Sequence, residues 1–124
     1  MYFEKDYIKR LITAASNMLI AITSGKDAVK SNIEDDNYDM KLSEDDLLEI
    51  MIRKYLEEGK INKAENLIFD SLESHVSKRN YEIALKFYDE INNYSDERLD
   101  KCNFSRKEII EGLEELKILG MRVE

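Results

Sequence analysis

The chain contains no proline and only four glycines, Gly25, Gly59, Gly112 and Gly120. Proline and glycine are the residues that most often mark turns, and a β-sandwich or barrel needs many of them. Between the glycines, apolar residues recur at intervals of three and four, which is the spacing of one helix face. These features predict an all-α fold, arranged as a single helical domain over residues 1–124.

The first predicted helix, about 3–24, has an unusually wide apolar face, and Gly25 follows where a glycine commonly ends a helix. Two neighbouring stripes of apolar residues run along this helix. One stripe can pack on the rest of the chain, and the other can meet a second copy, because most oligomers are symmetric dimers. The alternative is that both stripes lie in the core of one monomer. The residues expected at the interface are Tyr7, Ile8, Leu11, Ile12, Ala15, Met18, Leu19 and Ile22.

Residues 26–42 are polar and lack periodicity, which predicts an acidic loop after an N-terminal helix within 1–25. Ser43 is followed by three acidic residues, a pattern typical of a helix N-terminus. Helical hairpins are expected over 43–124. Gly59 and Gly120 are expected to end helices, and the 92–104 connection has room for one helical turn. The five predicted helices begin near Phe3, Ser43, Ile61, Asn80 and Ser105.

A spacing of about 33 residues relates the second predicted helix to the fourth. In the second helix the matching residues are Leu48, Met51, Ile52 and Tyr55, and in the fourth they are Tyr81, Ala84, Leu85 and Tyr88. This spacing, with Gly59 and Ala64 across the turn, resembles the tetratricopeptide repeat (TPR) over about 47–72. The usual terminal proline is missing, and an insertion follows at 92–103. The resemblance implies two antiparallel TPR-like hairpins; the alternative is ordinary helical hairpins.

The N-terminal segment Phe3-Glu4-Lys5-Asp6-Tyr7-Ile8, with the later Gly25-Lys26, resembles a family of uncharacterised helical proteins from clostridia and related Gram-positive bacteria. The proteins of that family open with an EKDYI-type segment and end in repeat-like hairpins. The resemblance implies an all-helical fold over the whole chain and supplies no activity.

The formal net charge of −8 argues against nucleic acid and anionic membrane surfaces as partners. Cys102 is the only cysteine, so no internal disulfide can form, which favours the cytoplasm. No apolar run reaches the length of a membrane span. A weak signal-peptide pattern in the first 25 residues is interrupted by Glu4 and Asp6, which argues against secretion.

The residues whose side chains could take part in catalysis or metal binding lack the partner residues that a site needs. His75 is the only histidine, and Cys102 lies in a polar connection. Asp35, Asn37 and Asp39 match the start of a calcium loop, but Met40 stands where that loop needs glycine. We therefore expect no catalytic residue, no cofactor and no bound metal.

The first hypothesis for function is a non-enzymatic protein-interaction module whose partner is another protein, foremost a second copy in a homodimer. The alternative is a small ligand-binding or enzymatic domain with an aromatic-lined pocket. The residues expected around that pocket are Tyr55, Tyr81, Phe87 and Tyr88.

Overall fold

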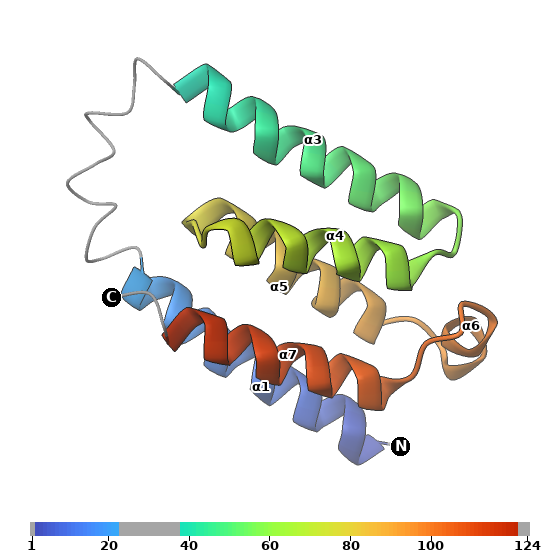
Figure 1. The fold of residues 1–124 in the computed structure, drawn as a ribbon. Coiled ribbons are helices and arrows are strands. Elements are labelled where there is room, and N and C mark those ends of the chain that lie inside the picture. Colours follow the sequence, from blue (N-terminus) through green and yellow to red (C-terminus); the bar gives the residue numbers. More distant parts are fainter. Residues whose placement is uncertain (1, 23–37, 122–124) are drawn as a thin grey trace.

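The computed structural model describes residues 2–22 and 38–121, which contain six helices and no strand (Figure 1). The all-α prediction is therefore confirmed for these residues. The helices are α1 (Tyr2–Ile22), α3 (Tyr38–Glu57), α4 (Ile61–Ser74), α5 (Lys78–Asn92), α6 (Asp96–Lys101) and α7 (Arg106–Met121).

Helix α6 brings the described helices to six instead of the predicted five, and it lies where the sequence left room for a helical turn in the 92–104 connection. The Ser95 hydroxyl accepts a hydrogen bond from the Arg98 amide at 3.1 Å, which caps the helix. Asp96 lies in its first turn and Lys101 in its last, so both charges oppose the helix dipole. One capped turn is thus stable within a connection whose apolar pattern is too short to predict a helix.

Helix α3 begins at Tyr38, five residues before the predicted cap at Ser43. Met40, Lys41 and Leu42 have high helix propensity and extend the helix toward the N-terminus. The capping pattern at Ser43 therefore lies inside the helix. The rest of the predicted acidic loop, with Gly25, lies outside the described residues.

The prediction that Gly120 ends the last helix is wrong, because α7 continues to Met121. Gly120 is buried, and a Cβ there would lie 2.8 Å from the Tyr81 hydroxyl oxygen. Gly112 plays the same part against Tyr88 two turns earlier. These glycines therefore allow two tyrosines of α5 to approach α7, rather than marking a turn.

The helices pack in a sequence that differs from their order in the chain (Figure 1). Helices α3 and α4 lie side by side and run in opposite directions, and α5 contacts α3, α4 and α7. Helix α1 packs against α5 and α7, at the opposite side of the molecule from α3. The first helix of the chain is thus held by the last.

The turn between α4 and α5 is organised by Asn80, a fully buried polar residue. Its side chain accepts a hydrogen bond from the Ser77 amide and donates to the Ser71 hydroxyl and the His75 carbonyl, at 2.8, 3.1 and 2.9 Å. The backbone N–H of Asn80 donates a hydrogen bond to the Ser77 hydroxyl, which completes a capping box. These bonds set the orientation of α4 relative to α5.

Candidate functional site

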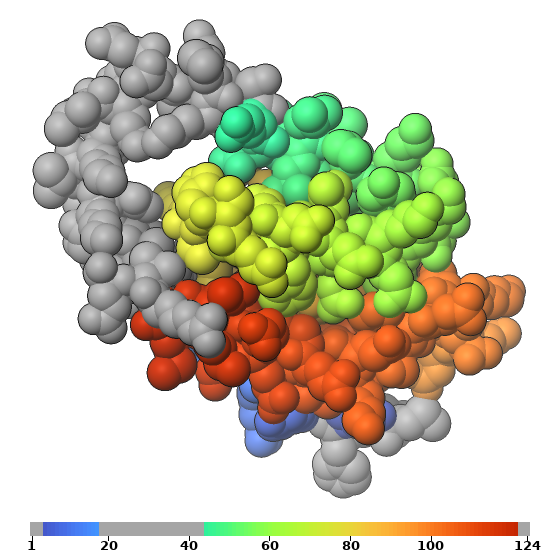
Figure 2. Space-filling model, viewed as in Figure 1, coloured from blue at the N-terminus to red at the C-terminus, as the bar shows by residue number. Residues whose placement is uncertain are grey.

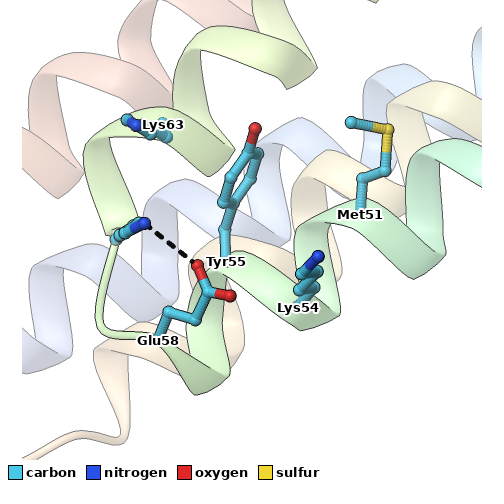
Figure 3. Close-up of a pocket in the computed structure, with 6 residues that line it drawn as sticks. Met51, Lys54, Tyr55, Glu58 and Lys63 are labelled. Carbon is cyan, nitrogen blue, oxygen red and sulfur yellow. Dashed lines mark ion pairs between the residues drawn. The ribbon is translucent and has the colours of Figure 1, made fainter.

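The turn between α3 and α4 borders a surface hollow of about 390 Å³ (Figure 3). The Tyr55 ring and the Met51 thioether point to the same side of α3, where they supply apolar surface. Both side chains are partly exposed. The residues that line the hollow are Met51, Lys54, Tyr55, Glu58, Lys60 and Lys63.

The short α3–α4 turn brings three lysines to this hollow. Gly59 adopts φ +75°, a left-handed conformation that ends α3 and reverses the chain without a Cβ penalty. Lys60 and Lys63 consequently line the same hollow as Lys54, although they follow Gly59 and Lys54 precedes it. Glu58 forms an ion pair with Lys60 at 3.2 Å, so the lining keeps an excess of positive charge. We call this surface the lysine hollow.

The outward face of α3 is apolar beside this hollow. Leu47 is 57% exposed and Ile50 is 64% exposed, and Met51 connects them to the hollow. The opposite face of the same helix carries buried residues of the core, including Leu48 and Ile52. Helix α3 therefore presents apolar side chains on two faces, and among the described helices only its inner face is covered.

A second hollow, also of about 390 Å³, lies between α4 and α7, which are neighbours on the face shown in Figure 2. Its lining has five glutamates and no basic residue, and Phe69 and Gly112 contribute the apolar part. We call it the acidic groove. The glutamates are Glu65, Glu73, Glu108, Glu111 and Glu115.

Glu65 is the one groove carboxylate that is tied to the core. The Tyr88 hydroxyl donates a hydrogen bond to its Oε2 atom at 2.6 Å. Partial burial raises the pKa of Glu65, the bond from Tyr88 lowers it, and the charges of Glu108 and Glu111 raise it; the net direction is upward. Burial and the neighbouring carboxylate also raise the pKa of Tyr88, which keeps the phenol a proton donor.

The groove does not have the geometry of a metal site. Among the described residues, no three side chains of histidine, cysteine, aspartate or glutamate are placed so that they could share one ion. His75 is exposed at the end of α4. Cys102 is half-buried, with its sulfur 3.6 Å from the position that a Cβ on Gly59 would occupy.

Of the residues of α1 that were expected at a dimer interface, most of those with described side chains lie inside the molecule. Ile8, Leu11 and Ala15 are buried, and Ile12 packs partly against the core. Tyr7 is 43% exposed. The side chains of Met18, Leu19 and Ile22 lie outside the described residues.

The four aromatic residues expected around a pocket lie in two different environments. Tyr81, Phe87 and Tyr88 are buried in the core, and the Phe87 and Tyr88 rings meet edge to face with centroids 5.0 Å apart. Tyr55 instead lines the hollow beside the α3–α4 turn. The structure thus brings two of them into contact and places Tyr55 at a separate surface.

The lysine hollow and the acidic groove were not found from the sequence. Each gathers charged residues from two helices, and each residue alone looks like part of a solvated helix face. Two sequence signals pointed toward the hollow. Tyr55 was expected to line a pocket, and Gly59 predicted a tight turn that brings the flanking helix ends together.

The part of the molecule that the structure describes is therefore all-helical, and two hollows on its surface carry opposite charge. None of its described helices is both long and apolar enough to cross a membrane. The chain matches the family of unknown function DUF6483 over residues 2–119 and belongs to that family. No match was found among curated proteins or among solved structures.

Proposed function

We propose that this chain is a cytoplasmic, non-enzymatic protein-interaction module, with the outer face of α3 as its docking surface. The observation that carries the proposal is the exposure of Leu47 and Ile50 on one side of a helix whose other side is in the core. Apolar side chains that cluster on a surface, rather than occur singly, mark interaction sites.

The arrangement of the helices supports a repeat-like architecture for this module. Helices α3 and α4 form one pair, α5 and α7 form a second, and α5 contacts both members of the first pair. Helix α1 packs on α5 and α7, at the far side of this arrangement from α3, and it runs parallel to α7 (Figure 1). We propose that α1 closes a two-unit stack that would otherwise be too short to be stable.

Capture experiments with two matched variants test the docking surface. The variant Leu47→Ser with Ile50→Ser removes the apolar face of α3, whereas Ile118→Ser with Met121→Ser removes two exposed apolar side chains of α7. Partner capture from the native cell should be lost in the α3 variant and kept in the α7 variant. Equal capture by both variants would refute the role of α3.

Self-association through α1 is the second form of the proposal, and the exposed ring of Tyr7 supports it. Light scattering over a range of protein concentrations should then give the mass of a dimer. Tyr7→Lys should shift the equilibrium to the monomer, whereas the double-serine variant of α3 should leave it unchanged. A monomer at all concentrations would refute this form.

A further inference from the structure

We propose that the outer face of α3 and the lysine hollow form one continuous docking surface for an amphipathic partner helix with a cluster of carboxylates at one end. This inference rests on the proposed function and specifies the chemistry of the partner. Leu47, Ile50 and Met51 would contact the apolar side of that helix. The three lysines at the α3–α4 turn would contact its acidic end.

The spacing along α3 fits a helical partner. Leu47, Met51 and Lys54 follow one another at successive turns, so the track from Leu47 to Lys54 is about 10 Å long at 1.5 Å per residue. A partner helix presents apolar residues at i, i+3 or i+4, and i+7 over the same length. Tyr55 adds an aromatic surface where the apolar track meets the hollow.

The charge of the hollow selects the acidic end of the partner. Lys60 pairs with Glu58, whereas Lys54 and Lys63 form no ion pair with any of the described side chains, those of residues 4–17 and 44–121. Two ammonium groups therefore face solvent beside apolar surface, in a chain whose net charge is −8. Carboxylates on a partner would meet complementary potential here.

The acidic groove strengthens this selection by repelling the same partner elsewhere. Its five glutamates lie between α4 and α7, away from the outer face of α3. A segment rich in carboxylates is attracted by the lysines of the hollow and repelled by the glutamates of the groove. Repulsion at the wrong surface adds to the specificity for the right one. A free polyanion such as nucleic acid would face the overall negative charge without using the apolar track.

The test uses two synthetic peptide helices that share apolar residues at i, i+4 and i+7 and differ only at one end. One peptide carries three glutamates at that end, and the other carries three lysines. Fluorescence anisotropy should show that the wild-type protein binds the glutamate peptide about tenfold more tightly, the scale expected for three exposed charge pairs.

Charge reversal supplies the matched protein variants. Lys54→Glu, Lys60→Glu and Lys63→Glu together should invert the preference, so that the lysine peptide binds more tightly. Lys86→Glu, Lys101→Glu and Lys107→Glu change the net charge equally at exposed positions outside the hollow and should keep the wild-type preference. Circular dichroism should show that both variants remain helical.

The outcomes separate this inference from the proposed function. Equal binding of both peptides, with binding lost in the Leu47→Ser and Ile50→Ser variant, would overturn the charge selection and retain α3 as the docking face. Binding to neither peptide would overturn the inference, and the capture experiment would still judge the proposed function. Tighter binding to a DNA oligonucleotide or to anionic vesicles than to the glutamate peptide would also overturn it.

Discussion

At the scale of single residues, one contact joins the core to the surface. Tyr88 is fully buried on α5, its hydroxyl bonds to Glu65 of α4, and its ring end lies against Gly112 of α7. Three helices therefore meet at one phenol. Small changes at any of the three residues should be detectable in stability, because packed interiors accommodate extra atoms poorly.

Substitution Gly112→Ala should destabilise the protein although alanine favours helices. The new Cβ would overlap the Tyr88 hydroxyl and lie 2.8 Å from Glu65 Oε2. Overpacking of this kind costs about 1–3 kcal/mol, against a helix-propensity gain of about 1 kcal/mol. Urea unfolding of Gly112→Ala, with and without Tyr88→Phe, measures the effect. The cost should fall when the hydroxyl is absent, and a gain of stability in the single variant would contradict the contact.

The raised pKa of Glu65 predicts a defined pH dependence. Because its folded pKa lies above its unfolded value, the charged form destabilises the fold at neutral pH. That destabilisation is present above the folded pKa and is lost as the pH falls toward the unfolded value near 4.5. The wild type should therefore gain stability relative to Glu65→Gln as the pH is lowered from 7 to 4.5.

Unfolding free energies at several pH values measure this difference. Glu114→Gln removes one exposed carboxylate outside the acidic groove and is the matched control. The pH dependence attributed to Glu65 would be wrong if the two variants gave parallel curves.

At the scale of the elements, the helices are positioned by their polar ends as well as by apolar packing. Arg106, the first residue of α7, donates to the carbonyl oxygens of Asn92 and Tyr94 at 2.9 and 2.7 Å. It thereby ties the start of α7 to the end of α5. Asn80 has the same role between α4 and α5.

Asn80→Ala should cost about 2–3 kcal/mol, because it removes a cap and leaves partly buried polar partners unpaired. Asn62→Ala is the matched control, since Asn62 is exposed and makes one bond of 3.4 Å, to the Asn103 carbonyl. Its cost should stay within about 0.5 kcal/mol. Thermal or urea unfolding of both variants gives the comparison, and similar costs would contradict the structural role of Asn80.

Helix positions could be predicted from the sequence where apolar periodicity and glycine agreed, as at Gly59. The prediction failed where one residue type can have either of two structural roles. Gly120 was expected to end a helix, but it makes room for Tyr81 inside α7. The fourth helix was expected to begin near Asn80, whereas Ser77 caps it three residues earlier and Asn80 is buried.

At the scale of the whole molecule, the surface sites could not be predicted because they depend on how the helices are rotated against one another. Lys54 and Lys63 are separated by a turn whose geometry decides whether they meet. The width of the apolar face of α1 was evident from its sequence. Which of its residues enter the core depends on the position of α5 and α7.

The packing of α1 predicts different effects for two adjacent residues. Ile8 is fully buried, so Ile8→Ala should cost about 2–5 kcal/mol through a cavity in the core. Tyr7 is 43% exposed, and Tyr7→Ala should cost less than about 1 kcal/mol. Chemical unfolding measured below any association threshold tests both. Equal costs would contradict the orientation of α1.

The contact between α1 and α7 also has a consequence for synthesis on the ribosome. Helix α1 emerges before the other described helices, but the helix it packs against most extensively, α7, is made after all of them. Until then the apolar face of α1 with Ile8, Leu11 and Ala15 lacks its most extensive contact, and that contact joins helices nearly a whole chain length apart. A product that stops before α7 would keep this apolar face open to chaperones and proteases. Docking of α1 thus distinguishes chains that include α7 from shorter products.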